Sequence, residues 1–453
     1  MLHPSIFKAN DIRGRVSGTT VDWDLAGARE LGRAYVELLQ LAGQEFVLGR
    51  DMRGLGRELS QAFISGARGA GASVIDIGLS ATDQLWFASG WLGLPGVQFT
   101  ASHNPSHDNG IKFCLRDAKP VPADFMVRLR DIASSAASGS PVPGGYRELD
   151  TLAAYAAKLN ELVPVAGPGG LKIVVDAGNG MAGHTARSVL AGRGLEIIGL
   201  YLELDGTFPN HPPNPLIPEN LVAAQQAVRE HHADLALVFD GDADRCFLID
   251  ERGEVVDPSV ITAMIALAEL EQEPGATIVI NSITSWAVAA AVGDRGKLVS
   301  AKVGHTYIKA AMAEQQAIFG GEHSAHYYFR DFWSADTGML AALHVMELVR
   351  RSGATLSALA AEFDGFFRSG EINLQVADIA ACQQRLAAEF ADRAVADYVD
   401  GLTMTSRAQD WWFNVRASNT EPLLRLNVET TSQAQLVRLR DEILAAASTF
   451  ALN

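Results

Sequence analysis

The sequence contains little cysteine. Its 453 residues include three cysteines, Cys114, Cys246 and Cys382, which lie far apart and are odd in number. This spacing matches neither a zinc-binding pattern nor a disulfide framework, and such usage is typical of proteins from a reducing cytosol. We therefore expect a cytoplasmic protein that is not stabilised by cross-links.

Long apolar runs and an excess of positive charge are also absent. Residues 1–20 lack the apolar core of a signal peptide, and the most apolar run, residues 261–268, is far too short to span a bilayer. The formal net charge of −16 disfavours nucleic acid and anionic membranes as partners. With no coiled-coil pattern in the chain, we expect a monomer.

The chain does have enough apolar residues, 48% of the total, to form several cores. Strand-like and helix-like segments alternate in the first three blocks, which predicts α/β domains with mixed or mostly parallel sheets. A smaller α+β domain is expected at the C-terminus. The predicted domains are 1–150, 151–254, 255–365 and 366–453, with a linker at Ser138–Gly145. Expected helices include 24–42, 59–69, 219–231, 335–351 and 433–447, and expected strands include 46–48, 73–77, 97–100, 171–176, 233–239, 277–280, 317–319, 411–416 and 424–429.

The run D-G-D-A-D-R at residues 240–245 directly follows the apolar segment 233–239. The apolar segment is predicted to be a buried strand, so Asp240, Asp242 and Asp244 lie at its C-terminal end, where open α/β sheets bind ligands. Three carboxylates at this spacing can converge on a hard cation, and Mg²⁺ is the expected occupant. Arg245 adds a fixed positive charge for an anionic substrate. The alternative is a solvated acidic turn.

A second polar loop, T-A-S-H-N-P, follows the predicted strand 97–100. Asn104 and Pro105 favour a tight turn that would project Ser102 from the strand end. Ser102 could then act as a nucleophile or phosphate carrier, with His103 beside it. Lys112, on the next predicted strand, could reach the same loop. The alternatives are an ordinary polar turn and a surface lysine.

Together these motifs resemble the α-D-phosphohexomutase superfamily, and most of all its bacterial phosphoglucomutase/phosphomannomutase group. Three further segments strengthen the resemblance. They are the opening F-K-A-N-D-I-R-G (7–14), the segment G-E-H-S-A-H (321–326), which is similar to the sugar-binding loop, and R-A-S-N-T-E-P (416–422), which is similar to the phosphate-binding loop. The four loop motifs follow the family's order, one in each predicted domain.

The resemblance implies four domains around a central cleft and an intramolecular phosphotransferase, an isomerase of carbohydrate metabolism. Such an enzyme interconverts hexose 1-phosphate and hexose 6-phosphate, here of glucose or mannose. The family's resting enzyme is phosphorylated on the serine that corresponds to Ser102. Glucose 1,6-bisphosphate is then the intermediate and activator, Mg²⁺ is the metal, and small phosphosugars are the substrates.

The resemblance also implies roles for individual residues. Ser102 carries the phosphoryl group and joins the three aspartates as a metal ligand. His103 and Lys112 are the candidates for acid and base, and Arg245 completes the catalytic group. The implied substrate-binding residues are Asn10, Arg13, His305, Glu322, Ser324, His326, Arg416, Ser418, Asn419, Thr420 and Arg425.

The sequence departs from the family pattern at a few positions. Asn10 replaces a usual tyrosine, His323 replaces the methionine of the phosphomannomutase/phosphoglucomutase group, and Ala325 often corresponds to glycine. These changes leave the choice between glucose and mannose open. The alternatives are a phosphoglucosamine mutase, which tends to have Pro at Ala417 and Gly at Asn419, a non-catalytic sugar-phosphate-binding protein, and a metal-dependent phosphatase.

Overall fold

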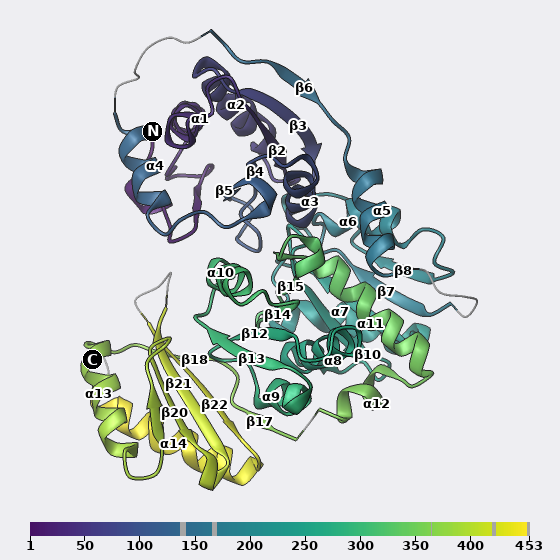
Figure 1. Ribbon diagram of the computed structural model, residues 1–453, viewed down its shortest axis with the longest axis vertical. Coiled ribbons are helices and arrows are strands. Elements are labelled where there is room, and N and C mark those ends of the chain that lie inside the picture. The colour runs from purple at the N-terminus through teal and green to yellow at the C-terminus, as the bar shows by residue number, and fades with distance from the viewer. Residues whose placement is uncertain (136–141, 165–169, 364, 419–422, 451–453) are drawn as a thin grey trace. The chain divides into compact units, whose positions relative to one another are not determined.

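The computed structural model describes residues 1–135, 142–164, 170–363, 365–418 and 423–450 (Figure 1). These residues form two compact units, which we describe separately. The first comprises Met1–Pro258 and Ser324–Ala358, and the second comprises Ser259–His323 and Leu359–Asn453. The fold class is confirmed: α/β sheets with parallel pairing precede a C-terminal domain with an antiparallel sheet.

The first sheet of the first unit has the strand order β1-β5-β4-β2-β3-β6. Strands β2, β3, β4 and β6 run parallel, whereas β5 pairs antiparallel with both β4 and β1. The bounds are β1 (Asp11–Arg15), β2 (Glu45–Arg50), β3 (Ser73–Leu79), β4 (Gly96–Phe99), β5 (Asp108–Cys114) and β6 (Tyr146–Glu148).

Helices α1 (Leu25–Leu39), α2 (Gly56–Gly69) and α4 (Phe125–Ala133) share one core with this sheet. On α1 the buried residues Ala28, Leu31, Tyr35 and Leu38 recur at helical spacing, so one face of the helix packs inward. Helix α3 (Thr82–Leu92) follows β3, and it is buried along most of its length.

The second sheet of this unit has the order β11-β10-β9-β7-β8. Strands β7, β8 and β9 are parallel, and β10 and β11 return antiparallel. The bounds are β7 (Lys172–Asp176), β8 (Glu196–Leu200), β9 (Leu235–Phe239), β10 (Cys246–Asp250) and β11 (Val255–Val256), with helices α5 (Leu152–Leu162), α6 (Ala182–Leu190) and α7 (Val222–His231).

The expected helix 335–351 begins later than predicted. Ala335 and Asp336 form strand β16, which pairs with β15 (Tyr327–Phe329), and helix α11 spans Gly338–Ser352. Thr337 is the N-cap, because its hydroxyl accepts from the Leu340 amide at 3.1 Å. The prediction was wrong here because the apolar pattern of the helix continues upstream of Thr337, into residues that belong to a strand.

The expected linker Ser138–Gly145 lies partly outside the described residues. Its described end already contacts the first sheet and its helix α2, since the Gly145 carbonyl accepts from the Val74 amide of β3 and the Gly144 amide donates to the Arg68 carbonyl of α2. The chain then continues directly into β6. This end is therefore an ordered sheet edge rather than a spacer.

The second unit contains the parallel strands β13, β12 and β14 and a C-terminal antiparallel sheet. The expected strand 317–319 lies two residues later. The bounds are α8 (Pro258–Gln272), β12 (Thr277–Asn281), α9 (Trp286–Val292), β13 (Lys297–Ala301), α10 (His305–Gln315) and β14 (Phe319–Gly321), and the short helix α12 (Leu356–Ala361) leads from the first unit back into the second.

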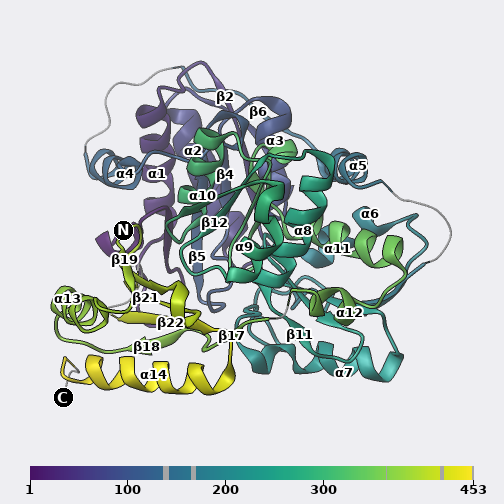
Figure 2. The same cartoon turned by 60° about the horizontal axis from the view of Figure 1, so that its bottom comes forward.

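The C-terminal sheet has one face covered by α13 (Ile379–Phe390) and α14 (Gln433–Ser448), as Figure 2 shows. Phe390 and Ile443 from these helices pack with Phe413 and Val428 of the sheet in a single core. The strands are β17 (Phe367–Arg368), β18 (Ile372–Leu374), β19 (Val395–Asp397), β20 (Leu402–Ser406), β21 (Trp411–Ala417) and β22 (Leu424–Thr430).

Candidate active site

The aspartate loop connects two buried strands of the first unit. Phe239 at the end of β9 pairs with Cys246 at the start of β10, so the six residues between them form a closed connection. Asp240, Asp242 and Asp244 are at most 1% exposed. One carboxylate oxygen from each of the three lies within 4.8 Å of those of the other two. The convergence of these side chains agrees with the sequence-based expectation.

The carboxylates have the chemistry of a cation site. Asp242 Oδ1 and Asp244 Oδ1 are buried, and neither atom has a hydrogen-bond partner among the described residues. Burial, and then the charge of Asp242, raises the pKa of Asp244 well above its usual range. A hard divalent cation would ligate such oxygens and offset the crowded negative charge. The three aspartates therefore fit a metal ion.

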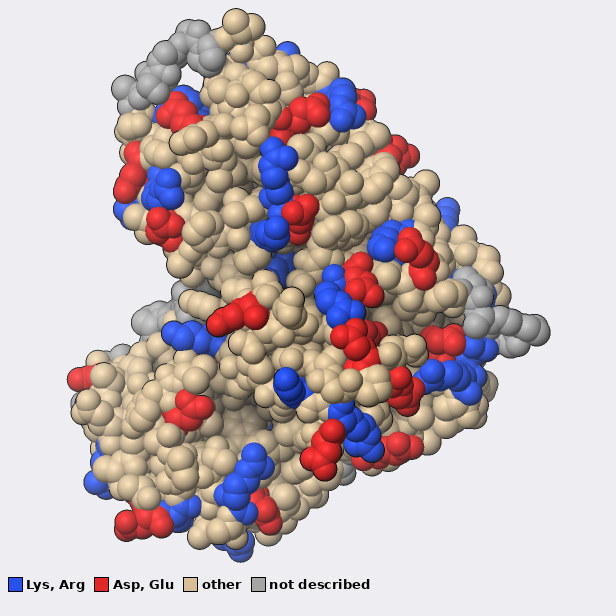
Figure 3. All heavy atoms as spheres, in the orientation of Figure 1, with Lys and Arg blue, Asp and Glu red and all other residues tan. Residues whose placement is uncertain are grey.

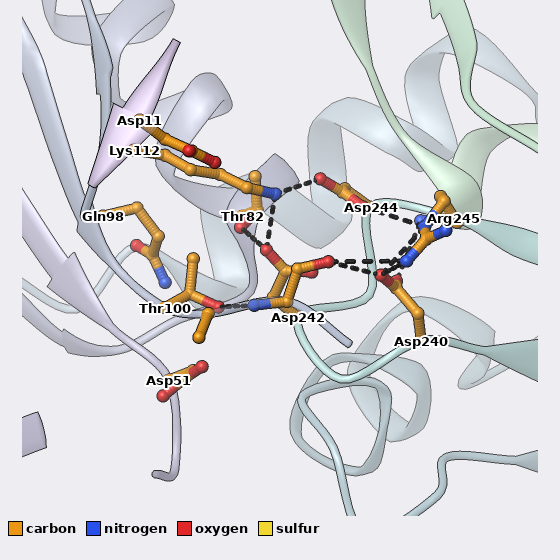
Figure 4. Close-up of polar contacts among 12 residues, drawn as sticks. Asp11, Asp51, Thr82, Gln98, Thr100, Lys112, Asp240, Asp242, Asp244 and Arg245 are labelled. Carbon is orange, nitrogen blue, oxygen red and sulfur yellow. Dashed lines mark hydrogen bonds and ion pairs between the residues drawn. The ribbon is translucent and has the colours of Figure 1, made fainter. Parts of the chain in front are cut away.

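Two basic side chains hold the same carboxylates (Figure 4). Lys112 Nζ lies 2.7 Å from Asp242 Oδ2 and 2.5 Å from Asp244 Oδ2. Arg245 donates to Asp240 Oδ2 from Nε at 3.0 Å and from Nη2 at 2.8 Å. Burial opposes ionisation of Asp242, but Lys112 outweighs it and keeps the pKa of that carboxyl below its usual range. Lys112 thus belongs to the site and is not a surface lysine.

Ser102 lies against this loop. Its hydroxyl donates to Asp240 Oδ2 at 2.9 Å, and the residue is 3% exposed. The backbone of Ser102 has a φ of 51°, a left-handed conformation that is uncommon for serine. Its amide donates to Thr100 Oγ1 at 2.9 Å, which helps to hold that conformation. The loop is therefore a tight, strained turn that directs the hydroxyl at the carboxylates.

The two loops approach so closely that residue 241 must be glycine. A Cβ built on Gly241 would lie 2.4 Å from the carbonyl oxygen of Ser102, far inside van der Waals contact. The glycine of D-G-D-A-D-R is thus required by the neighbouring serine loop.

His103 is held as a neutral base beside the serine. Its Nδ1 lies 3.2 Å from Ser102 Oγ and accepts from Arg245 Nη2 at 2.5 Å. Burial and the charge of Arg245 lower the pKa of His103 well below its usual range. Lys112 differs, because the neighbouring aspartates outweigh burial and raise its pKa. The two predicted acid–base candidates therefore differ in charge.

Arg13 joins the N-terminal motif to the serine loop. It donates to the Ala101 carbonyl at 2.9 Å and to Asn104 Oδ1 at 3.1 Å, and it pairs with Asp11 at 2.8 Å. Asn10, in the turn before β1, is half-buried. The motif therefore contacts the serine loop through Arg13.

His326 brings the predicted sugar loop to the aspartates. His326 Nε2 lies 3.8 Å from Asp244 Oδ1, and His326 Nδ1 lies 2.9 Å from Ser324 Oγ. Ala325 between them has a φ of 65°, a left-handed conformation that glycine adopts more readily than alanine. Ser324 and His326 belong to the first unit, whereas Glu322 belongs to the second.

The second unit holds the predicted phosphate site. Arg416 and Arg425 face each other across β21 and β22, and Glu371 pairs with both, at 2.7 Å and 3.3 Å. Arg416 is 3% exposed, and its Nε has no hydrogen-bond partner within the described part of the chain. The Ser418 amide donates to the Leu423 carbonyl. Asn419 and Thr420 lie outside the described residues.

His305 begins helix α10 of the same unit. The Asp400 carboxylate accepts from the amide of Val303 at 3.0 Å and from Ser282 Oγ at 2.8 Å, so a residue of the C-terminal sheet domain holds the turn before His305. Glu322 is 2% exposed and lies close enough to Arg416 to affect its pKa.

Four family models match consecutive parts of the chain. They describe phosphoglucomutase/phosphomannomutase α/β/α domain I at residues 4–139, domain II at 153–253, domain III at 257–366 and the C-terminal domain at 371–446. The chain belongs to the phosphoglucomutase/phosphomannomutase family.

Similar proteins cover nearly the whole chain. A phosphomannomutase of Salmonella montevideo is 42% identical over 96% of both chains, and a protein of Xanthomonas campestris described as phosphohexose mutases is 40% identical over 96% of this chain and 97% of its own. The crystal structure of a phosphoglucomutase/phosphomannomutase family protein from Burkholderia thailandensis has a TM-score of 0.91 and 31% identity. It covers 100% of this chain and 99% of that chain.

Sequence reasoning missed several residues that support this family's site. Arg53 donates to the carbonyl oxygens of Ser102 and Asn104, both at 2.7 Å, and pairs with Asp51 at 3.3 Å. Arg53 follows the end of β2 by three residues. Because ligand-binding loops of α/β sheets follow strand ends, this position could have marked it as a site residue. Glu371 and Asp400 gave none, because their roles depend on contacts between distant segments.

Acidic and basic side chains lie interspersed over the described residues of the face in Figure 3. Within the described residues, each helix is too short or too polar to cross a bilayer. The three cysteines are all described and buried, and they form no disulfide.

Proposed function

We propose that this protein is a phosphohexomutase that interconverts hexose 1-phosphate and hexose 6-phosphate, with Ser102 as the phosphoryl carrier. The observation that carries the proposal is the 2.9 Å contact between Ser102 Oγ and Asp240, inside a cluster of three buried carboxylates and two cations. A solvated acidic turn would have neither the burial nor these partners. The family's chemistry supplies the reaction class.

Each turnover contains two phosphoryl transfers, one from Ser102 to the sugar and one from the sugar back to Ser102. Phosphorylated Ser102 first gives its phosphoryl group to the free hydroxyl of a sugar monophosphate, so the Ser Oγ–P bond breaks and a 1,6-bisphosphosugar forms. The sugar then presents its other phosphate, and Ser102 Oγ takes that group as the sugar oxygen leaves. In the first transfer the attacking sugar hydroxyl loses one proton and the leaving Ser102 Oγ gains one, and in the second transfer the Ser102 hydroxyl loses one proton and the leaving sugar oxygen gains one.

The metal in this proposal is Mg²⁺, held by Asp240, Asp242 and Asp244 together with the phosphate on Ser102. Bound there, it supplies charge stabilisation for phosphoryl transfer. Arg245 adds a permanent positive charge next to Ser102 Oγ, at 3.5 Å from Nη2. The groups proposed for proton transfer are His103 and Lys112: burial and the charge of Arg245 lower the pKa of His103 and hold it neutral, whereas the neighbouring aspartates raise the pKa of Lys112 and hold it cationic.

The second phosphate of the intermediate is assigned to Arg416 and Arg425, with Ser418, Asn419 and Thr420 as further contacts. A guanidinium fork binds a phosphate without reading the sugar, so it can serve both orientations of the intermediate. Asn10, Arg13, His305, Glu322, Ser324 and His326 are assigned to the sugar and its phosphates. The substrates proposed are glucose and mannose phosphates.

The domain boundaries 1–150, 151–254, 255–365 and 366–453 are part of this proposal and are supported by the four matched segments. We also propose that the protein is cytoplasmic and that it is a monomer. Sedimentation would test the monomeric state. A mass corresponding to two chains would contradict the monomer.

The decisive experiment is phosphate mapping followed by a substrate comparison. Incubation with glucose 1,6-bisphosphate should phosphorylate Ser102, as read by peptide mass spectrometry, and Ser102→Ala should remain unlabelled. The matched control is Ser106→Ala, which removes an exposed hydroxyl from the same loop. Coupled assays should then give the highest kcat/KM for glucose or mannose 1-phosphate. Labelling of an aspartate, or a preference for glucosamine 1-phosphate, would contradict the proposal.

A further inference from the structure

Helix α3 begins at the aspartate loop. Its N-cap residue is Ala81, which has no side-chain oxygen to cap the first turn. The amide of Thr82, at the start of the helix, instead donates to the main-chain carbonyl of Asp242 at 3.0 Å. The helix start and the aspartate loop are about 160 residues apart in sequence. An amide of the first helical turn, which has no partner within the helix, is thus hydrogen-bonded to a carbonyl of the aspartate loop.

The Thr82 side chain also contacts Asp242. Its hydroxyl donates to Asp242 Oδ2 at 2.5 Å, and Lys112 Nζ donates to the same oxygen at 2.7 Å. Two donors on one oxygen fix the plane of the carboxylate. The other oxygen, Oδ1, is buried and receives no hydrogen bond from the described residues. The carboxylate is therefore oriented so that Oδ1 is the oxygen available to a cation.

The first turn of α3 is itself held firmly. The Asp83 carboxylate accepts from Tyr155 OH and from Thr337 Oγ1, both at 2.7 Å. Gln84 Nε2 donates to Thr151 Oγ1 at 3.0 Å. Three consecutive buried side chains are thus anchored. Thr82 contacts the aspartate loop, Asp83 contacts helix α5 and the N-cap of α11, and Gln84 contacts the residue before α5. A hydroxyl on such a turn has a fixed position, as a positioning group needs.

We infer that Thr82 is a positioning residue for the metal site, because its hydroxyl fixes the Asp242 carboxylate with Oδ1 directed at the bound cation. This inference rests on the proposed function, since it concerns the metal ion of that reaction. Thr82 does not touch the reacting atoms. Its loss should weaken cation binding without changing which residues ligate the metal.

The test is Mn²⁺ binding to the whole protein, measured by electron paramagnetic resonance as the loss of the free Mn²⁺ signal. Thr82→Val keeps the shape of the side chain and removes the hydroxyl, so we expect the Kd for Mn²⁺ to rise about tenfold, as for other losses next to a metal ligand. Thr82→Ser restores the hydroxyl and should bind within about twofold of wild type. The Mg²⁺ concentration for half-maximal activity should change in the same order, while KM for glucose 1-phosphate stays close to wild type.

Thr185→Val is the matched control. Thr185 is a fully buried threonine of α6 whose hydroxyl faces the Met181 carbonyl at 3.4 Å. This variant should lose stability without losing Mn²⁺ affinity. Thr82→Ala is the second hydroxyl-free variant and must also weaken binding, so poor folding of Thr82→Val cannot decide the outcome.

The possible failures are distinguishable. If the wild type binds Mn²⁺ and both hydroxyl-free variants bind it equally well, the positioning role is wrong and the proposed function is unaffected. If the wild type does not bind Mn²⁺ at all, the metal site of the proposed function fails together with this inference.

Discussion

The two charged sites of the chain are built with opposite signs. In the first unit, buried carboxylates converge and the cations Lys112 and Arg245 neutralise them in part. In the second unit, Arg416 and Arg425 converge and the carboxylate of Glu371 neutralises them. In each site the protein supplies a counter-ion of the same sign as the ligand that we propose for the site: cations beside the proposed metal ligands, and a carboxylate beside the proposed phosphate-binding arginines. An incoming metal or phosphate must therefore share or displace an internal ion pair.

This arrangement has a physical reason. A buried charge without a partner costs several kcal/mol, so neither site could fold with its ligand-binding charges alone. The counter-ion lowers that cost, but it also lowers the affinity for the ligand because it competes for the same side chains. The comparison predicts that removing a ligand-binding charge costs much activity, whereas removing a counter-ion with no proposed role in the reaction, such as Glu371, costs little activity or improves binding.

The largest effect is expected for Arg416→Ala. Loss of this guanidinium should raise KM for both 1-phosphosugars and 6-phosphosugars by roughly 30- to 1,000-fold, the range expected for lost charge-assisted hydrogen bonds to phosphate. Steady-state kinetics in both directions measure it. Arg440→Ala, which removes a half-buried arginine of α14 that pairs with Asp441, is the control. An effect confined to one direction would argue against a single phosphate site for both orientations.

The next largest effect is expected for Asp242→Asn. The loss of one anionic oxygen should raise the Mg²⁺ concentration for half-maximal activity roughly 50-fold. Activity assays over a Mg²⁺ titration measure it. Asp234→Asn, a half-buried carboxylate before β9 that accepts from the Lys172 amide, is the control. Full activity after exhaustive chelation would contradict the metal assignment itself.

A smaller effect of opposite direction is expected for Glu371→Gln. The amide keeps the size of the side chain and removes the competing charge, so KM for phosphosugars should fall about threefold, in line with a partly exposed ion pair. Glu389→Gln, at a surface pair with Arg385, is the control. A strongly raised KM would show that Glu371 mainly holds the arginines in place and does not compete with phosphate.

The smallest effect on turnover is expected for Asp83→Asn, which tests a buried carboxylate that accepts hydrogen bonds from the hydroxyls of Tyr155 and Thr337. Burial, against the hydrogen bonds of Tyr155 and Thr337, raises the pKa of Asp83 to about 7. Between pH 4 and 7 the folded protein keeps this proton while the unfolded chain loses it, so Asp83 destabilises the fold increasingly as pH rises. The stability gained by Asp83→Asn should grow over this window by about 1 to 3 kcal/mol. Denaturant unfolding at several pH values measures it, and a gain independent of pH would contradict the raised pKa.

The sequence predicted the parts of the site that are encoded by neighbouring residues, such as an apolar strand followed by polar turn residues. The apolar strand before Asp240 and the turn residues after Ser102 placed both loops at strand ends, and the structure brings them together. Strand and helix alternation predicted the fold class, since periodicity depends on neighbouring residues. The helix start was misplaced at Ala335 because a capping threonine is a weak signal inside an apolar pattern.

The supporting residues could not be predicted in this way. Thr82 reads as an ordinary helix residue, and its contact with Asp242 exists only because two sheets are packed together. Glu371 lies 45 residues from Arg416, and the antiparallel sheet brings them within 2.7 Å. Arg53 reaches four backbone carbonyls of one loop, which a linear pattern does not encode.

The contact between Gly241 and the Ser102 carbonyl limits how this chain can be recombined. The two loops lie in separate segments of the gene, so a chimera that joins the first predicted domain of one relative to the second domain of another would exchange them independently. Such a chimera can keep the catalytic distances only if the donor of the aspartate loop also brings a glycine at this position and the donor of the serine loop follows the same backbone path. The natural unit of exchange therefore includes both of these domains, and a chimera should not be joined near residue 150.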